Sequence, residues 1–384
     1  MYSSCMVGKI AESISDTFNK ESYKDVVLIN TSDVLNGDVL NHEYVPNSNL
    51  KGQFKKTFKK GDILYSEIRP GNCHYAYIDF DAEGYIASTK LMVIRTNEKF
   101  NSKFLYYYLT SQNVIKHLQI QAESRSGTFP QITFNEISNL SIPNFEINKQ
   151  NAIVKIMEAF DNKINLNQRI NFSLENLIID ISKQTIQNSN VTECVASEHY
   201  DIYIGKTPPR KESEWFSFKK EDNIVWTSIK DMGTSDMYLL DSSEYLTAYA
   251  VEKFNINKVL PGSILLSFKL TIGRVKIAAV PMTTNEAIAC FSSDDARKLA
   301  WIYPILKTYN YEHLGSTSSI AKAINSKMVK AMLLPMPNDD VLDDYYKKVK
   351  PLYELLNNNT KENIALIELR DTLLPKLMSG EIEV

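Results

Sequence analysis

The sequence predicts an α+β protein with two β-rich domains in tandem, separated and joined by two long helices that form an antiparallel coiled coil with pseudo-twofold symmetry. Three observations support this fold class. Residues 148–187 contain neither Pro nor Gly, and their apolar residues recur alternately four and three positions apart. The same pattern returns 192 residues later. The segment before each helix has short apolar runs separated by turn residues, which is typical of strands.

The first long helix carries a coiled-coil seam, because apolar residues spaced four and three apart keep one narrow stripe on a partner helix. The seam positions are Ile153, Met157, Phe160, Ile164, Asn167, Asn171, Leu174, Ile178 and Ile181. A shift of 192 residues gives Tyr345, Val349, Leu352, Leu356, Asn359, Asn363, Leu366, Arg370 and Leu373. The dipeptides Ile142-Pro143 and Leu334-Pro335 also correspond. We therefore interpret the chain as a tandem duplication.

Both copies of the seam place Asn at the same two positions, Asn167 with Asn171 and Asn359 with Asn363. A buried Asn in a seam fixes register and orientation at a cost in stability, so these residues favour pairing of the two helices. The alternative is a polar stretch on partly exposed helices. Pro351 lacks a backbone donor and predicts a kink or restart in the second helix.

The β-rich segments repeat their order of elements. After a basic stretch that ends near residue 62, residues 63–95 read as short strands, and residues 102–120 read as a helix capped by Ser102. In the second copy, residues 224–232, 261–280 and 283–291 correspond to strands of the first. The predicted divisions are residues 1–145, a spacer helix at 146–187, residues 188–338, and a C-terminal helix and tail at 339–384.

Charge and cysteine content narrow the class of protein. Residues 1–145 hold 15 Lys/Arg and 15 Asp/Glu, and residues 188–338 hold 17 and 16, so contacts with nucleic acid would have to come from local clusters. The four Cys form no Cys-x-x-Cys pair, which argues against a disulfide framework or a zinc site. Without an apolar signal core or a membrane-length apolar run, a soluble cytoplasmic protein is expected.

Motifs for catalysis or cofactor binding are missing. The sequence has no Gly-x-Gly-x-x-Gly, no P-loop, no His-Glu-x-x-His, and no Asn/Asp-Pro-Pro-Tyr/Phe tetrad of amino-methyltransferases. The five His show no metal-ligand spacing, and the adjacent Cys73 and His74 favour a structural role in a turn over a catalytic dyad. We expect no enzymatic activity, no cofactor and no metal in this chain.

Several loops place Lys or Arg beside small polar and aromatic residues, the mixture that DNA contacts use for phosphates and base edges. For any single residue, a solvated surface is the simpler interpretation, but the duplicated set favours binding of double-stranded DNA. The candidates in the first half are Lys55, Lys56, Lys59, Lys60, Arg69, His74, Tyr75, Arg125 and Thr128. Those in the second half are Lys206, Arg210, Lys211, Ser228, Lys230, Lys269, Thr271, Arg274 and Lys322.

On these residues the chain resembles the specificity subunits of type I restriction–modification systems. The likeness is carried by IGKTP at 204–208, IVWTSIKDM, the GDILYS and GSILLS strands, ASTKLMVIR, IVKIMEAFDNKINLNQRI and the ending LRDTLLPKLMSGEIEV. Residues 1–25 lack the Gly-x-Thr-Pro and Trp features of the second copy.

The resemblance implies two target-recognition domains that each read half of a bipartite asymmetric DNA site. It also implies that the two helices act as a spacer and dock two methyltransferase subunits, which restriction subunits join. S-adenosylmethionine, ATP and Mg would then belong to the partners. A helix of about 40 residues spans roughly 60 Å, enough to separate two domains by one DNA turn of about 34–36 Å. The alternative is a coiled-coil scaffold with two protein-binding domains and no DNA.

Overall fold

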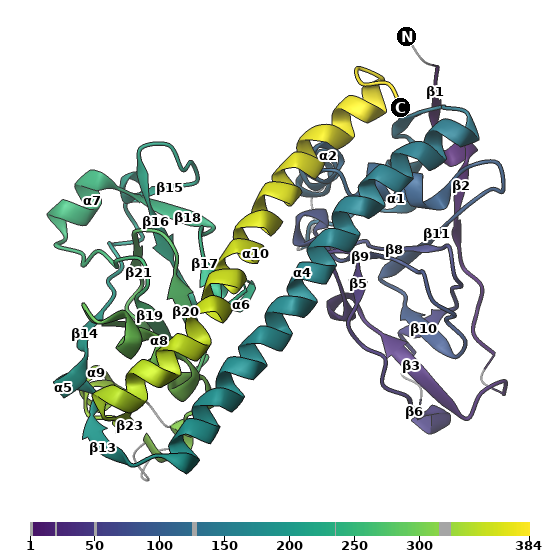
Figure 1. The fold of residues 1–384 in the computed structure, drawn as a ribbon. Helices are drawn as coiled ribbons and strands as arrows, with labels where there is room; N and C mark the ends of the chain where they lie inside the picture. The colour runs from purple at the N-terminus through teal and green to yellow at the C-terminus, as the bar shows by residue number, and fades with distance from the viewer. Residues whose placement is uncertain (1–2, 20, 50–51, 125–128, 235, 315–323) are drawn as a thin grey trace. The chain divides into compact units, whose positions relative to one another are not determined.

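The computed structural model describes residues 3–19, 21–49, 52–124, 129–234, 236–314 and 324–384. Its contacts divide the chain into two units (Figure 1). Unit 1 comprises Met1–Asn162 with Leu366–Val384, and unit 2 comprises Lys163–Ala365. The two long helices, α4 (Ile147–Asn188) and α10 (Asp339–Ser379), each contribute residues to both units.

Unit 1 contains two four-stranded sheets. The first has the order β2 (Ala11–Ile14), β11 (Leu91–Thr96), β8 (Ile63–Ser66), β9 (Tyr75–Tyr77). The second has the order β6 (Val45–Pro46), β3 (Asp25–Ile29), β10 (Tyr85–Ser88), β7 (Phe54–Lys56), and its β3–β10 pair is parallel. Two small antiparallel pairs are β1 (Ser4–Met6) with β12 (Ser141–Pro143), and β4 (Val34–Leu35) with β5 (Asp38–Val39).

Three short helices complete unit 1: α1 (Ser102–Leu109), α2 (Gln112–Glu123) and α3 (Phe134–Ser138). The prediction of one helix over residues 102–120 was wrong, because the helix ends at Thr110 and a new one starts after Ser111. The predicted cap was displaced by one residue. Asn101 caps α1 by accepting hydrogen bonds from the backbone N–H groups of Lys103 and Phe104.

Unit 2 repeats the arrangement. Its first sheet has the order β14 (Asp201–Ile204), β22 (Ile288–Ser292), β19 (Ile264–Ser267), β20 (Val275–Ala278), β17 (Tyr238–Leu239). The second has the order β15 (Phe216–Ser217), β18 (Glu244–Thr247), β16 (Asn223–Thr227), β21 (Met282–Thr284), again with one parallel pair, β16–β21. A two-stranded pair joins β13 (Val191–Val195) and β23 (Leu333–Pro337). The helices are α5 (Ala196–His199), α6 (Ile229–Thr234), α7 (Ala248–Lys253), α8 (Ala296–Thr308) and α9 (Ser326–Lys330).

The two units thus share one topology. The strand order β2-β11-β8-β9 of unit 1 returns as β14-β22-β19-β20 in unit 2, and the parallel pair and the terminal antiparallel pair return as well. The predicted α+β class with two sheet-rich domains and long helices is confirmed.

The two long helices run antiparallel in each unit. In unit 2, Asn167 of α4 bonds Asn363 of α10, and Asn171 bonds Asn359, so the residue number rises on one helix as it falls on the other. In unit 1, Asp161 of α4 pairs with Arg370 of α10, so a lower number on α4 again meets a higher number on α10. Of the predicted kink or restart at Pro351, the restart was wrong, since α10 continues from Asp339 to Ser379. The missing hydrogen bond is tolerated where Val349 and Tyr353 are buried against unit 2.

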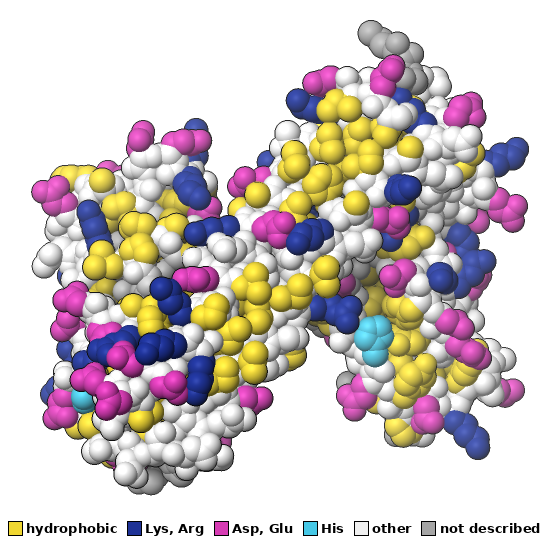
Figure 2. All heavy atoms as spheres, viewed as in Figure 1, with side chains coloured by type: hydrophobic (Ala, Val, Ile, Leu, Met, Phe, Trp, Pro, Cys, Tyr) yellow, Lys and Arg dark blue, Asp and Glu magenta, His cyan; other side chains and the backbone are white. Residues whose placement is uncertain are grey.

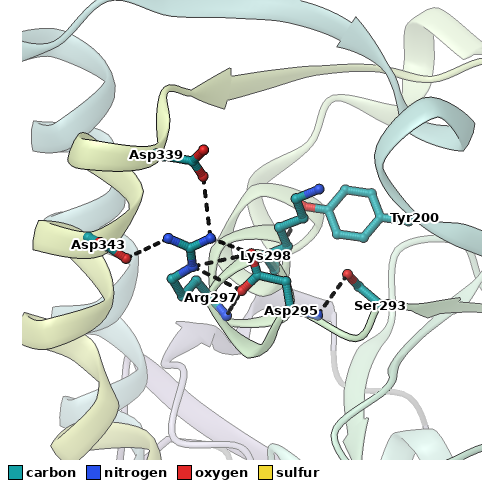
Figure 3. A network of polar contacts seen from close by, with 7 residues as sticks. All are labelled: Tyr200, Ser293, Asp295, Arg297, Lys298, Asp339 and Asp343. Atoms are coloured by element: carbon teal, nitrogen blue, oxygen red, sulfur yellow. Dashed lines mark hydrogen bonds and ion pairs between the residues drawn. The ribbon is translucent and has the colours of Figure 1, made fainter.

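In unit 2, α8 anchors the β-rich part to α10 through charge and aromatic contacts (Figures 1 and 3). Asp295 caps α8, and the Arg297 guanidinium beside it lowers the pKa of this carboxyl. The same guanidinium reaches α10, with Nη1 2.6 Å from Asp343 Oδ1 and Nη2 3.3 Å from Asp339 Oδ1 (Figure 3). Between the same two helices, the Trp301 ring packs edge-on against Tyr345, with ring centroids 4.9 Å apart.

Candidate nucleic-acid interface

The basic stretch of unit 1 begins within strand β7 and continues into the loop after it. Lys55, Lys59 and Lys60 are exposed. Lys56 is half-buried, and its Nζ donates to the carbonyl oxygens of Thr89 and Leu91 at 3.2 and 2.8 Å. Burial lowers the pKa of Lys56. Lys56 therefore fastens β7 to neighbouring strands, whereas the other three lysines can meet a polyanion.

The loop between β8 and β9, together with the first residue of β9, holds three candidates with different surroundings. Arg69 is exposed, and among the described residues its guanidinium has no side-chain hydrogen bond or ion pair. His74 Nδ1 lies 2.7 Å from the carbonyl oxygen of Val34. Tyr75 is buried, with its ring stacked on Tyr65 at 5.8 Å. The structure therefore places Arg69 at the surface and Tyr75 in the core.

Three candidates lie outside the described residues: Arg125, Thr128 and Lys322.

The segment that follows β14 in unit 2 holds an aromatic-backed arginine. Arg210 forms a two-bond ion pair with Glu244 at 2.7 and 2.9 Å, and these hydrogen bonds raise its pKa. Its guanidinium lies over the rings of Phe216 and Trp226, 4.1 and 4.7 Å from their centroids. Such an arginine is held in place and keeps its charge at the surface.

Two neighbouring lysines differ in their contacts. Lys206 is exposed, and its Nζ donates to the carbonyl oxygen of Phe254 at 2.8 Å. Lys211 is exposed, and among the described residues its side chain has no bonded partner. Lys211 is therefore the more available of the two for a phosphate.

Ser228 and Lys230 lie at the start of α6. The hydroxyl and N–H of Ser228 both donate to Asp231 Oδ2, at 2.6 and 2.9 Å. Burial opposes ionisation of Asp231, but hydrogen bonds from Ser228 and Ser243 outweigh it and lower the pKa. Ser228 therefore uses its hydrogen bonds at the first turn of α6, whereas the side chain of Lys230 is exposed.

The loop between β19 and β20 holds the remaining candidates. Lys269 and Thr271 are exposed. Arg274 is half-buried, and its Nη1 donates to the carbonyl oxygen of Ile229 at 2.7 Å. A Cβ at Gly233 would meet the Arg274 guanidinium at 2.5 Å, so the two groups are packed together. Arg274 is held within unit 2 by the backbone of α6.

Sequence reasoning missed an aromatic platform in unit 2. Lys253 lies over the Trp215 ring at 4.1 Å and beside the Tyr249 ring at 5.7 Å, and Tyr249 is 62% exposed. Exposed aromatics with lysines provide stacking and charge to nucleic acids. The predicted contacts combined basic residues with small polar ones, and the segment AYAVEKF around Tyr249 and Lys253 contains no small polar residue. Attention to aromatic residues four positions from a Lys would have found them.

The seam residues lie at the helix interface. Asn167 Nδ2 donates to Asn363 Oδ1 at 2.9 Å and to Glu362 Oε2 at 2.7 Å, and Asn359 Nδ2 donates to Asn171 Oδ1 at 2.9 Å. All four Asn are buried. The other pairing candidates are buried or half-buried: Ile153, Met157, Phe160, Ile164, Leu174, Ile178, Leu352, Leu356, Leu366 and Leu373.

Other kinds of site find no support in the described residues. They hold no group of three or more His, Cys, Asp or Glu side chains placed to bind a metal ion. Across the same ranges, no helix combines the length and apolar content that crossing a bilayer requires.

Comparison with known proteins identifies the class. A family model described as the type I restriction modification DNA specificity domain matches residues 7–176. The type I restriction enzyme HindI specificity subunit of Haemophilus influenzae is 30% identical over 98% of this chain and 98% of its own. The MjaIX specificity subunit of Methanocaldococcus jannaschii is 23% identical over 90% of this chain and 85% of its own. The chain belongs to the family of type I restriction–modification specificity subunits.

This membership confirms the predicted class of function: the chain is the DNA-recognition component of such a system and not a catalytic one. It also sets aside the alternative of a scaffold that does not bind DNA. The family model spans the first copy, which lacks the Gly-x-Thr-Pro start. The crystal structure of the type I S subunit from M. genitalium shares the fold, with a TM-score of 0.53 at 17% identity and coverage of 98% of this chain and 96% of its own.

Proposed function

We propose that the chain recognises a bipartite, asymmetric DNA site, with residues 1–145 and 188–338 each reading one half. In this proposal residues 146–187 and 339–384 provide the spacer. The observation that carries it is the repeated topology of the two units combined with unlike loop side chains. A duplicated scaffold presents equivalent loops, and different side chains on those loops give the two halves of the site different sequences.

Exposed lysines would supply contacts to phosphates, which position a protein on DNA without reading its sequence. In unit 1 they are Lys55, Lys59 and Lys60, and in unit 2 they are Lys211 and Lys230. Figure 2 shows basic and acidic side chains interspersed over the visible face. Because neither half has a large excess of positive charge, binding should rely on these local groups.

An apolar stripe on α4 within unit 2 would dock a partner subunit. Leu166, Ile170 and Leu177 are exposed and lie within about 40° of one another around the helix axis. Phe172, 67% exposed, adds a large ring on another side of the same helix. Such a stripe fits the apolar face of another helix. We assign it to a methyltransferase subunit, of which the duplicated chain would take two.

The chemistry of the complex would then belong to other chains. Methyltransferase subunits would bind S-adenosylmethionine, and restriction subunits, where present, would use ATP and Mg. The complex would act in the cytoplasm, on the DNA of its host.

The test is to map methylated adenines in the source genome with and without this gene. One bipartite motif should lose its methylation when the gene is deleted. Exchanging residues 188–338 for those of a relative should change only one half of that motif. A genome whose methylated motifs are the same in both strains would contradict the proposal, as would an exchange that alters both halves.

A further inference from the structure

The two units carry the same loop at the same place in their first sheets. It joins β8 to β9 in unit 1 and β19 to β20 in unit 2. A buried serine, Ser66 or Ser267, ends the first strand of each loop. The N–H of Ser66 donates to the carbonyl of His74, and that of Ser267 to the carbonyl of Arg274, both at 2.9 Å. These bonds close the loops, and the loop of unit 1 is one residue longer.

Each serine hydroxyl also ties its loop down. Ser66 Oγ accepts the N–H of Ile68 at 3.0 Å, and Ser267 Oγ accepts the N–H of Arg274 at 3.0 Å. In unit 1 the loop is fixed further where the N–H of Arg69 donates to the carbonyl of Pro130 at 3.0 Å. Both loops are therefore fixed structures.

Both loops hold left-handed residues in the same pattern. Three residues after the serine, Arg69 has φ 44° and Leu270 has φ 62°. Directly before the closing residue, Cys73 has φ 57° and Gly273 has φ 88°. A residue with a side chain adopts this conformation only where the surroundings impose it, and such residues concentrate at binding sites. Arg69 and Leu270 therefore occupy equivalent positions in two loops that share this pattern of left-handed residues.

The side chains at this position are exposed in both units. Leu270 is 92% exposed. Arg69 is exposed, and its guanidinium has no side-chain hydrogen bond or ion pair with a described residue. A strained backbone that presents to solvent a leucine, or an arginine without a charged partner among the described residues, is explained by a bound partner.

We propose that this position is a base-reading position in both units, an inference that rests on the proposed function. The Arg69 guanidinium would donate to the O6 and N7 acceptors of a guanine in the major groove. The Leu270 side chain would pack against the C5-methyl group of a thymine. Equivalent positions with a cation in one unit and an apolar group in the other suit two readers of different half-sites. If two identical copies of a protein bound these two positions, the positions would be expected to carry similar side chains. An arginine in one unit and a leucine in the other therefore favour DNA over such a protein.

The surroundings of Leu270 also fit DNA. Lys269 precedes it, and Lys230 follows the Ile229 whose carbonyl binds Arg274; both lysines are exposed and can meet phosphates. Arg274, which the sequence suggested as a base reader, becomes a positioning residue. It fixes the returning end of the loop against the backbone of α6.

The test uses the complete chain in its host, with the host genome as the DNA probe. Strains carrying Arg69→Ala or Leu270→Ala are compared with the unaltered strain by mapping every methylated adenine. Lys99→Ala removes an exposed charge elsewhere in unit 1, and Leu260→Ala removes an exposed leucine elsewhere in unit 2, so these are the matched controls. All four positions are exposed, and melting temperatures of the purified variants check that each folds.

Each variant should relax one base position of the methylated motif, Arg69→Ala in one half and Leu270→Ala in the other. The discrimination lost at that position should be roughly 5- to 150-fold, since a good base contact contributes about 1–3 kcal/mol. The controls should leave the motif unchanged.

The outcomes separate the two proposals. If deletion of the gene removes no motif, the proposed function fails. If the motif depends on the gene but stays at full occupancy in both variants, this inference alone is overturned. Uniform loss of methylation at all sites without relaxation would overturn it too, because it would assign the position to phosphates or to partner docking. Relaxation of the same half by both variants would also overturn it.

Discussion

The two units attach the long helices by different chemistry. In unit 1, α1 contacts α4 through polar groups: Asn101 Nδ2 donates to Asn151 Oδ1 at 2.7 Å, and the Tyr107 hydroxyl donates to Asp161 at 2.6 Å. Asp161 also pairs with Arg370 of α10 at 2.8 Å. In unit 2, the equivalent helix α8 contacts α10 through the ion pairs of Arg297 with Asp339 and Asp343 and through buried rings, with Trp301 against Tyr345.

This difference shows what the duplication preserved. The capping residues Asn101 and Asp295 occupy the same place, and both helices lie along a long helix, yet few of the contacting side chains are alike. A backbone arrangement survives such exchange as long as apolar surface is buried and buried polar groups find partners. We therefore expect the Trp301–Tyr345 contact to contribute much of the attachment in unit 2, and the Tyr107–Asp161 hydrogen bond to contribute less in unit 1.

The largest expected effect is on unit 2. Trp301→Ala should lower the free energy of unfolding by about 3–5 kcal/mol, because it leaves a cavity beneath Tyr345 and removes an indole hydrogen bond to Pro335. Trp301→Phe fills most of the space and should cost clearly less. Chemical denaturation of both variants checks this. Equal losses would mean that ring burial is not what holds α8.

The next effect depends on pH. Lys276 of β20 lies opposite Leu265, and the matching residue opposite Leu64 in unit 1 is the buried Ala76. Burial, with a smaller contribution from Lys307, lowers the pKa of Lys276 to about 8. Below pH 8 the half-buried Lys276 of the folded unit is charged. Between pH 8 and about 10.4 the folded side chain is neutral while the unfolded one remains protonated, so stability rises with pH.

Lys276→Ala should remove this rise. Relative to the variant, the unaltered protein should gain on the order of 2 kcal/mol between pH 7 and pH 9.5. Denaturation of both proteins at the two pH values measures the difference. Parallel pH profiles would show that Lys276 is accommodated without cost.

A smaller effect is expected from the polar attachment of unit 1. Tyr107→Phe removes only the hydroxyl that donates to Asp161, and it should cost about 0.5–1.5 kcal/mol. Asp161 keeps its pairing with Arg370, which limits the loss. A double-mutant cycle with Asp161→Asn isolates the term. A coupling energy of zero would mean that the unit 1 attachment is also apolar in origin.

The Asn layer should affect register more than stability. Asn171 Nδ2 and Asn363 Nδ2 are buried without an acceptor among the described residues. The four Asn that form this layer therefore already lower the stability of the helix pair. Asn167→Leu with Asn171→Leu should leave the chain folded but allow wrong pairing or association. Sedimentation velocity measures the oligomeric state. The register is measured by disulfide crosslinking of cysteines introduced into α4 and α10. An unchanged oligomeric state together with unchanged crosslinking would contradict the role assigned to the Asn residues.

The smallest effects compare phosphate contacts in the two units. Lys60→Ala in unit 1 and Lys211→Ala in unit 2 should each weaken binding to all sequences alike and reduce the salt slope of binding by about one unit. Affinities of the assembled complex at several salt concentrations provide the slopes. A variant that changes the recognised sequence instead would move that lysine from phosphate contact to base reading.

The sequence by itself determined the repeated order of elements, the α+β class and the seam spacing of the long helices. These follow from periodicity and repetition, which are local properties of the chain. The seam spacing of Asn167 and Asn171 held regardless of the rest of the fold, because a helix interface selects residues at regular intervals.

Only the tertiary structure decided which loop residues face solvent. Tyr75 and Arg274 look like contact residues in the sequence, but one is buried on Tyr65 and the other is bound to the carbonyl of Ile229, 45 residues away. Leu270 is apolar and yet almost fully exposed. Exposure depends on long-range packing and on backbone conformations such as the left-handed one at Leu270. Neither can be predicted from the identities of the neighbouring residues alone.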